Sequence, residues 1–376
     1  MRWPEVEIQK FAEVVTGGTP STRKPEYWGG EIPWLGSGEL NAGEVNESKK
    51  FITELGLASS SARMMPPHTV MIALTGATVG VTGYLNIHAC ANQSVTGVLP
   101  TGKHIPRYLY YFLKSIRNRV IDDAYGGGQP HISQGYVKKI KVPLPPLEEQ
   151  KRIAGILDEA DRVRKKTQAL IDKYDELAQS LFLDMFGDLF SDSTIPLGDL
   201  VEFSQGIQIG IENQRLQPEE GFERFLRIID FTQGDDLRFV PQVDEKYRVK
   251  HDDIVMVRYG TVGFVGTNKE GVLANNLFKI NYDRKRFNQM FLFHVFQHAR
   301  FKRFIEKEAY GATMPALSFK VMRTYDIPCP SLKMQNLFAE QIGFIDGLKG
   351  TASNSLSNSA KLFNALLQKA FKGELT

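Results

Sequence analysis

The feature that most constrains this 376-residue chain is an internal repeat, because each half must then fold into the same kind of unit. The tripeptide Ala-Tyr-Gly at 124–126 recurs at 309–311, and the proline-rich segment 142–147 recurs at 327–332. Further matches at the same spacing of 185 positions are Gln150 with Gln335, Asp161 with Asp346, Leu177 with Leu362, Leu181 with Leu366 and Phe186 with Phe371. Such an ordered series predicts an internal duplication.

Each repeat begins with a mixed region, at residues 1–145 and 188–330. Runs of β-branched and apolar residues, such as 69–75 and 254–257, are typical of strands between turns. An amphipathic helix is expected after them in each copy, over 108–122 and 290–308. With 42% hydrophobic and 24% charged residues the chain has a globular composition. These features predict an α+β fold with two similar domains.

Each repeat ends in a long helical segment, residues 146–187 and 331–376. The first helix is predicted from 147 to 186 and would be about 60 Å long at 1.5 Å per residue. Apolar residues recur in steps of three and four, which is the pattern of a coiled-coil seam. The predicted seam consists of Ile153, Ile156, Val163, Leu170, Tyr174, Leu177 and Leu181 in the first copy, and Phe338, Ile345, Leu348, Leu362 and Leu366 in the second. Two seams in one chain favour mutual packing, with a solvated single helix as the alternative.

Several broad classes of protein are excluded by simple counts. Two cysteines far apart, Cys90 and Cys329, give neither a disulfide framework nor a thiolate zinc site, and they fit a reducing compartment. No apolar run is long enough to span a membrane, and the first residues lack the apolar core of a secretion signal. A cytoplasmic protein is therefore expected. The net charge is only +3, so a polyanion would have to meet local basic patches.

Motifs for catalysis or cofactor binding are weak. Residues 97–104 nearly match a phosphate-binding loop, but His104 replaces the hydroxyl residue that would hold magnesium, so an ordinary turn is expected. His294 and His298 have a metal-binding spacing without a third ligand, so a solvated or DNA-facing pair is the preferred interpretation, and no metal is predicted. Adenine-methyltransferase, methyl-donor and nuclease motifs are missing. The sequence predicts a non-catalytic chain without a cofactor of its own.

Features typical of nucleic-acid binding lie at the same place in both copies. A basic helix leads into a glycine-containing loop, residues 125–131 and 310–315, in which aromatic and amide side chains offer stacking and base-edge hydrogen bonds. The candidate DNA contacts are Lys114, Arg117, Arg119, Tyr125, Gly127, Gln129 and His131 in the first copy, and Arg258, Arg300, Lys302, Arg303, Tyr310 and Thr313 in the second. A solvated helix followed by a tight turn is the alternative.

Together these segments resemble the specificity (S) subunits of type I restriction-modification systems over essentially the whole chain. The most specific parts are Gly-Gly-Thr-Pro-Ser at 17–21, the Tyr-Trp and Pro-Trp pairs at 27–28 and 33–34, Gly-Ala-Thr-Val-Gly at 76–80 and Gly-Gln-Pro-His-Ile-Ser at 128–133. The clearest is the segment 143–154. The second half departs from the pattern: it lacks the Thr-Pro-Ser and tryptophan pairs, and Leu-Lys-Met-Gln replaces Leu-Glu-Glu-Gln at 332–335.

The resemblance implies two target-recognition domains, residues 1–145 and 188–330. It also implies two spacer helices, within 146–187 and 331–376, that pack as an antiparallel coiled coil. Such a chain binds double-stranded DNA with a bipartite target and docks methyltransferase subunits and, through them, restriction subunits. S-adenosylmethionine, ATP and magnesium would belong to those partners, in a bacterial or archaeal cytoplasm. Two alternatives remain: a coiled-coil scaffold whose globular heads do not read DNA, and a nuclease or methyltransferase with unrecognised motifs.

Overall fold

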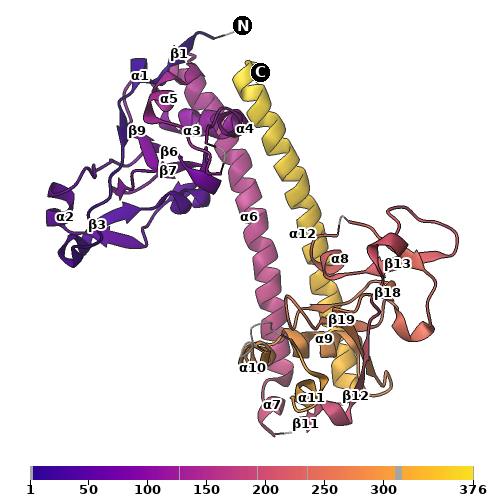
Figure 1. Ribbon diagram of the computed structural model, residues 1–376. Coiled ribbons are helices and arrows are strands. Elements are labelled where there is room, and N and C mark those ends of the chain that lie inside the picture. Colours follow the sequence, from indigo (N-terminus) through magenta and orange to yellow (C-terminus); the bar gives the residue numbers. More distant parts are fainter. Residues whose placement is uncertain (1–2, 127, 193, 235, 310–315, 376) are drawn as a thin grey trace. The chain divides into compact units, whose positions relative to one another are not determined.

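The chain divides into two units, each of which combines a mixed α+β region with parts of two long helices (Figure 1). The computed structural model describes residues 3–126, 128–192, 194–234, 236–309 and 316–375. Unit 1 joins residues 1–168 to 354–376, and unit 2 is residues 169–353. The long helices are α6 (Leu147–Phe186) and α12 (Leu332–Lys372). The bounds of α6 are those predicted from the sequence.

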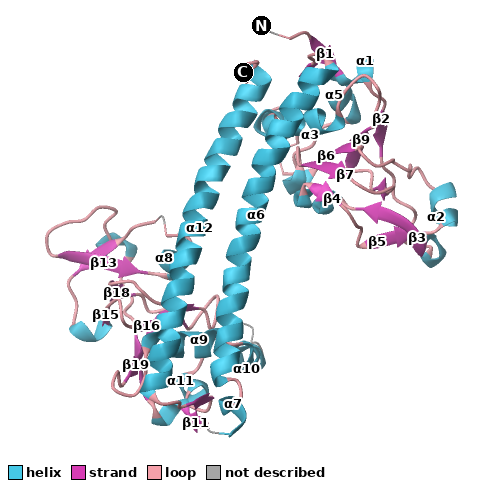
Figure 2. Ribbon diagram, turned by 180° about the vertical axis from the view of Figure 1, so that it is seen from behind, coloured by secondary structure: helices cyan, strands magenta, loops and turns pink. Residues whose placement is uncertain are grey.

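The described residues of unit 1 form three sheets, and Figure 2 shows β6, β7 and β9 side by side. The five-stranded sheet has the order β2 (Val14–Thr16), β9 (Val95–Val98), β6 (Val70–Ala73), β7 (Thr82–Leu85) and β4 (Glu44–Val45). The other sheets are β5 (Lys50–Ile52), β3 (Trp28–Leu35) and β8 (Cys90–Ala91), and the antiparallel pair β1 (Glu5–Glu7) and β10 (Lys141–Pro143). The helices are α1 (Ile8–Phe11), α2 (Glu54–Ala58), α3 (Pro106–Ser115), α4 (Arg117–Asp122) and α5 (Gln134–Lys139), with 3-10 turns at Pro25–Tyr27, Ser37–Ala42 and Gly76–Thr78. Every residue of β6, β7 and β9 is buried, and β6 accordingly reads as a continuous apolar run.

In unit 2, the part of the chain that the structure describes also forms three sheets. The first has the order β12 (Val201–Gln205), β19 (Leu277–Tyr282), β16 (Ile254–Val257) and β17 (Val265–Gly266). The others are β14 (Phe239–Pro241), β13 (Phe222–Leu226), β18 (Gly271–Leu273) and β15 (Arg248–Val249), and the antiparallel pair β11 (Thr194–Pro196) and β20 (Asp326–Pro328). The helices are α7 (Leu189–Asp192), α8 (Ile228–Thr232), α9 (Gln289–Gln297), α10 (Ala299–Ala309) and α11 (Phe319–Met322), with 3-10 turns at Leu197–Asp199, Ile211–Asn213 and Glu245–Tyr247.

Both amphipathic helices predicted in the mixed regions are interrupted. The helix expected over 108–122 is divided into α3 and α4 at Ile116, and the one expected over 290–308 is divided into α9 and α10 at His298. His298 has an extended backbone, and its ring stacks on Phe190 at 4.9 Å between centroids. Periodicity along one segment could not show this contact, because it comes from a residue about a hundred positions away.

In each unit the long helices are part of the hydrophobic core. The core of unit 1 joins Leu157 of α6 and Leu367 of α12 to the aromatic face of α3. In unit 2, Phe182 and Phe186 of α6 pack against Phe338 of α12 and Phe291 of α9. Burying one such phenylalanine contributes roughly 1.5–3 kcal/mol to stability. These contacts fix the mixed region of each unit on its helix segments.

Within each unit the two helix segments run in opposite directions. In unit 1 Arg152 donates to the carbonyl of Leu375 at 2.5 Å, whereas Arg164, further along α6, lies over the ring of Phe363, earlier in α12. In unit 2 Asp175 pairs with Lys349, and further along α6 the rings of Phe186 and Phe338 meet at 5.4 Å. In both units, successive residues of α6 therefore contact successively earlier residues of α12.

The predicted seam is wrong for much of the contact between the two helices. Only Ile153, Phe338 and Ile345 of the predicted residues are buried. Ile156, Tyr174, Leu181 and Leu366 are half-buried, whereas Val163, Leu170, Leu177, Leu348 and Leu362 are exposed. Among the buried residues of α6, Ala154, Leu157 and Ile171 each directly follow a predicted seam residue, and Asp161 is buried as well. One residue turns a helix by 100°, so the exposed apolar residues lie beside the seam.

A buried carboxylate explains why the apolar pattern gave the wrong face. Asp161 occupies a seam position and is 3% exposed. Burial alone would raise its pKa, but Arg164 at 2.7 Å and Lys165 at 3.1 Å hold the pKa of Asp161 below its usual value. A paired charge can therefore occupy a position that a search for apolar residues passes over.

A buried glutamine anchors the first turn of each long helix. Gln150 accepts from the backbone N–H of Ile105 at 2.8 Å and donates to the carbonyl of Pro145 at 2.8 Å. Gln335 makes the corresponding bonds to Asn288 at 2.8 Å and Pro330 at 2.9 Å. Each glutamine thus joins its long helix to the segment that begins α3 or α9.

Replacing either buried glutamine by leucine is expected to destabilise the chain by about 2–3 kcal/mol, because one backbone donor and at least one backbone acceptor lose their partners inside the protein. Chemical unfolding of Gln150→Leu and Gln335→Leu measures this loss. Gln179→Leu, on an exposed position of α6, serves as the matched control. Equal stability of all three variants would show that the glutamines do not anchor the helices.

Two groups in unit 1 make its stability depend on pH in separate ranges. Burial lowers the pKa of His104 to about 4. Burial raises the pKa of Glu44, but hydrogen bonds from Lys165 and Arg107 outweigh this and lower it to about 2. Since the unfolded histidine binds a proton near pH 6.5 and the folded one only near pH 4, acid destabilises the fold between these values. The stabilisation from Glu44 is lost at lower pH, from its ordinary pKa of 4.5 down to about 2.

We therefore expect stability to decline below pH 6.5, with His104 contributing up to about 1.4 kcal/mol per pH unit. His104→Leu should reduce the decline between pH 6.5 and 4 and leave the later loss below 4.5 unchanged. His88→Leu, at an exposed position, is the control. A pH profile of unfolding that is identical for His104→Leu and the wild type would contradict this assignment.

Candidate nucleic-acid interface

In unit 1 two glycine-containing motifs, far apart in sequence, lie against each other. The loop over 125–131 returns to the turn at 76–80: Gly76 donates to the carbonyl of Pro130 at 2.8 Å, and Ile132 donates to that of Leu74 at 2.9 Å. Tyr125 and His131 close the loop with two backbone hydrogen bonds, at 3.1 and 2.8 Å, and their ring centroids are 3.8 Å apart. The turn at 76–80, which follows β6, and the loop at 125–131, which follows α4, thereby form one combined surface, which we call the loop–turn surface.

The turn requires glycine and brings two polar side chains together. Gly76 and Gly80 have φ values of 66° and 74°, in the left-handed region that disfavours side chains. Gln129 lies over Gly76, with its amide nitrogen 3.6 Å from where a Cβ would stand. The stem of Arg117 lies over Gly80 in the same way, with its Cγ at 3.2 Å. Both side chains, together with Tyr125, are exposed.

Unit 2 repeats this geometry in its described part. Gly260 and Gly263 have φ values of 92° and 79°, and the chain after the second loop returns to the turn, because Tyr259 bridges to Ala316. Leu317 donates to the carbonyl of Arg258 at 3.0 Å. The predicted contacts Tyr310 and Thr313, like Gly127 of unit 1, lie outside the described residues.

Arg258 supports the loop–turn surface of unit 2 through three contacts of its side chain. Its Nε donates to the carbonyl of Leu317 at 3.2 Å, a second nitrogen bonds the side chain of Gln205, and the guanidinium lies over Phe319 at 4.6 Å. Two of its three guanidinium nitrogens are thus engaged within the protein, and we assign it a positioning role. Sequence reasoning missed Gln205 and the exposed Tyr259, although Tyr259 directly precedes the Gly-Thr-Val-Gly motif as Thr75 precedes its counterpart.

The remaining predicted basic contacts do not gather on the loop–turn surfaces. Lys114 lies over the rings of Tyr110 and Phe363, and burial lowers its pKa, so it belongs to the helix contact. Arg300 donates to the carbonyl of Phe190 at 2.5 Å. Arg119 and Arg303 line separate cavities, and Lys302 is exposed on α10. The structure therefore brings together Arg117, Tyr125, Gln129 and His131 but separates Lys114 from them.

The two motifs that partly match a phosphate-binding loop and a metal site have structural roles. The segment 97–104 is a turn between β9 and α3, in which His104 contacts Thr101 at 3.0 Å. His294 stacks on Phe182, and burial lowers its pKa to about 4, so the expectation of a solvated or DNA-facing histidine is wrong. Within the described ranges no group of three or more histidine, cysteine, aspartate or glutamate residues could hold a metal. None of the described helices is both long and apolar enough to cross a bilayer.

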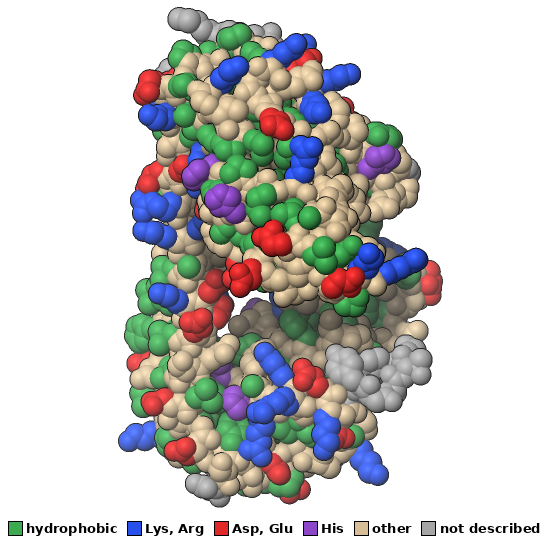
Figure 3. Space-filling model, turned by 90° about the vertical axis from the view of Figure 1, so that its left-hand side faces the viewer, with side chains coloured by type: hydrophobic (Ala, Val, Ile, Leu, Met, Phe, Trp, Pro, Cys, Tyr) green, Lys and Arg blue, Asp and Glu red, His purple; other side chains and the backbone are tan. Residues whose placement is uncertain are grey.

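Charges are distributed rather than concentrated. Figure 3 shows lysine and arginine side chains in small groups over one face, with acidic side chains between them. This pattern agrees with the net charge of +3. Any polyanion would therefore be bound by local contacts and not by one general basic field.

The chain matches the model of the type I restriction modification DNA specificity domain at residues 2–173 and again at 194–348. It is 29% identical over 195 residues to the type I restriction enzyme MjaIX specificity subunit of Methanocaldococcus jannaschii, covering 50% of this chain and 44% of that one. The matched stretch thus spans less than half of that relative. The MjaVIII specificity subunit of the same organism is 22% identical over 382 residues, covering 92% of this chain and 86% of that one.

Solved structures share the fold. A crystal structure of the type I restriction-modification system S subunit from M. genitalium superposes with a TM-score of 0.59 at 16% identity, covering 99% of this chain and 96% of that one. A chain from a structure on complex assembly and conformational transition of the type I system gives the same TM-score at 17% identity, with 99% and 98% covered.

Proposed function

The chain belongs to the type I restriction-modification DNA specificity family, and from this membership we propose that it is the subunit that reads a bipartite DNA target. The observation that carries the proposal is the loop–turn surface of unit 1, whose glycine turn and returning chain recur in the described part of unit 2. Gln129 offers an amide for adenine, Tyr125 a ring, and Arg117 a charge for phosphate or guanine. Two such surfaces in one chain suit two separate half-sites.

The long helices are proposed to form an antiparallel coiled-coil spacer between two duplicated recognition domains. Opposite directions of α6 and α12 within each unit support this, as does the equivalent anchoring by Gln150 and Gln335. Because α6 and α12 each continue from one unit into the other without interruption, they would fix the length of the non-specific gap.

Partner docking is proposed on the exposed apolar residues of the spacer. In unit 2 Leu337, Phe344 and Leu348 are 49%, 70% and 54% exposed, and their spacing places them on one face of α12. We assign this face to a methyltransferase subunit, through which restriction subunits would join. S-adenosylmethionine, ATP and magnesium would act in those partners, in a bacterial or archaeal cytoplasm, and this chain would supply no catalytic group.

The test uses this chain in complex with its methyltransferase and measures binding to a selected duplex. Gln129→Ala is expected to weaken specific binding by about 10- to 100-fold, because one base contact is worth roughly 1–3 kcal/mol, and to leave random-sequence binding unchanged. Gln9→Ala, an exposed glutamine on α1, is the control. If the wild-type complex does not distinguish selected from random duplex, the chain is a scaffold and the proposed function fails.

A further inference from the structure

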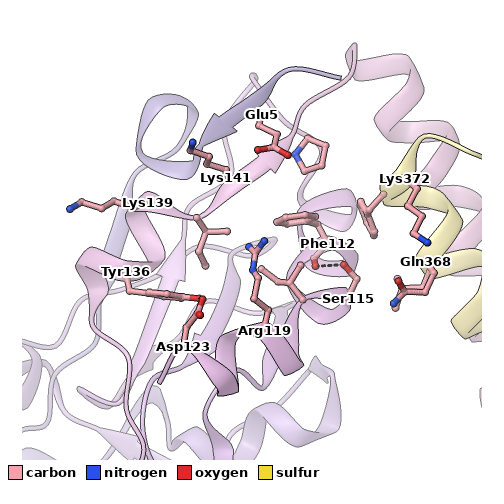
Figure 4. A pocket seen from close by; sticks show the side chains of 15 residues that line it. Glu5, Phe112, Ser115, Arg119, Asp123, Tyr136, Lys139, Lys141, Gln368 and Lys372 are labelled. Carbon is pink, nitrogen blue, oxygen red and sulfur yellow. Dashed lines mark hydrogen bonds between the residues drawn. The ribbon is translucent and has the colours of Figure 1, made fainter. Parts of the chain in front are cut away.

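Each unit contains a cavity at an equivalent position, apart from its loop–turn surface. The cavity of unit 1, about 550 Å³, lies among α3, α4, β10 and the end of α12 (Figure 4). The cavity of unit 2, about 500 Å³, lies between α10 and the start of β20. Residues that line the two cavities correspond to each other at the 185-position spacing of the repeat. The pairs are Ser115 with Arg300, Arg119 with Phe304, and Ile140 with Tyr325.

The cavity of unit 1 has a cationic rim that the protein itself leaves unpaired. Arg119, Lys139, Lys141 and Lys372 line it, and none of the four has a carboxylate within 4.0 Å in the described part of the chain. Figure 4 shows the guanidinium of Arg119 reaching toward the middle of the lining. Unpaired cations around a concave surface attract a carboxylate or phosphate.

The floor of the same cavity is apolar. Phe112 and Phe371 meet edge to face, with their ring centres 5.3 Å apart, and Leu367 and Ile116 complete the floor. A ligand that matches both the cationic rim and the apolar floor carries an anionic group next to an aliphatic or aromatic group. Glu5 and Asp123 also line the cavity, and they would disfavour the many adjacent charges of a phosphate backbone more than a single carboxylate.

A residue that lines the cavity of unit 2 carries a buried hydrogen-bond donor without a partner. The hydroxyl of Tyr325 is buried without a partner among the described residues, and the side chain is 4% exposed. Burial raises the pKa of Tyr325 to about 12, so the hydroxyl keeps its proton at neutral pH. Arg300 and Arg303 line the same cavity and likewise lack a carboxylate partner in the described ranges. Leaving a buried donor unpaired is costly, which favours a ligand that accepts from it.

We propose that each cavity binds an acidic peptide segment of the methyltransferase subunit, with a carboxylate on the cationic rim and a neighbouring apolar side chain on the floor. This inference rests on the proposed function for the identity of the partner. Two equivalent cavities in one chain suit two copies of one partner. A protein segment fits better than DNA, because it can place one carboxylate beside an apolar side chain, whereas DNA brings a row of adjacent phosphates.

The experiment measures the affinity of the full chain for its methyltransferase subunit by titration calorimetry at low and high salt. One charge reversal is Arg119→Glu with Lys139→Glu, and the other is Arg303→Glu with Lys307→Glu, two residues that line the cavity of unit 2. Each is expected to weaken binding at least tenfold and to reduce its salt dependence. Lys10→Glu with Lys49→Glu, exposed lysines of unit 1 that do not line the cavity, should change affinity less than twofold.

Tyr325→Phe provides a variant that keeps the fold. It should raise the thermal midpoint, because it removes an unpaired buried hydroxyl, and yet weaken methyltransferase binding several-fold. Unchanged methyltransferase affinity in all cavity variants would overturn the inference. Loss of DNA affinity with normal methyltransferase binding would overturn it as well and assign the cavities to phosphates. If the wild-type chain binds no methyltransferase, the proposed function fails first, and this inference with it.

Discussion

Exchanging residues 3–145 for the matching segment of another family member is expected to change one half of the DNA target and preserve the other. Affinity for the original target should fall about 10³-fold or more, toward non-specific binding, because direct base contacts in one half are lost. Each unit has its own core and its own loop–turn surface, so unit 2 should continue to read its half-site.

The exchange must preserve the contacts of unit 1 with its helix segments. The donor segment should keep Tyr111, whose hydroxyl donates to Asp158 of α6 at 2.7 Å, and Lys114, which lies over Phe363. The reciprocal exchange of residues 188–330 should change only the other half-site. Binding selection on both hybrids is the measurement. Altered preference in both halves after one exchange would mean that the units read DNA jointly.

Inserting one heptad into each long helix is expected to abolish tight binding to the original target. Insertions after Lys165 and after Lys361 would face each other, since Arg164 lies over Phe363. They preserve the seam and lengthen the helices by about 10 Å, close to three base pairs. Affinity for the original gap should fall at least about 100-fold, because only one half-site can be engaged at a time.

Duplexes with altered gaps complete this test. Three added base pairs also rotate the second half-site by roughly 100°, at about 10.5 pairs per turn, so a longer gap restores binding only if the duplex or spacer accommodates this rotation. A three-residue insertion in α6 alone is the control and should cost stability, because it breaks the seam. Original affinity for the original gap after the double insertion would show that the helices do not measure DNA.

The sequence predicted features that depend on local pattern. The bounds of α6, the strand at 254–257 and the turn at 97–104 are as predicted, because helix starts, apolar runs and proline positions act locally. The contact between the loop at 125–131 and the turn at 76–80 joins residues far apart in the sequence. The repetition of both motifs in the second half nevertheless indicates that both segments are important for the domain.

The sequence-based predictions that are wrong share a common cause, because each depends on tertiary contacts. The predicted seam face is wrong because Asp161 is buried with Arg164 and Lys165 as partners. Apolar periodicity cannot evaluate the free-energy cost of burying a carboxylate or its reduction by such partners. Lys114 was assigned to DNA because sequence gives its charge but not the rings of Tyr110 and Phe363 beside it. The unpaired cations of the two cavities could not be foreseen, since pairing depends on side chains from several elements.

Selection of bound duplexes from a random pool, with the purified complex of this chain and its methyltransferase, tests the central claim most directly. The account predicts two short invariant blocks separated by a gap of constant length and free sequence, with one block altered by Gln129→Ala. Enrichment of a single continuous block, or no enrichment over the starting pool, would contradict it.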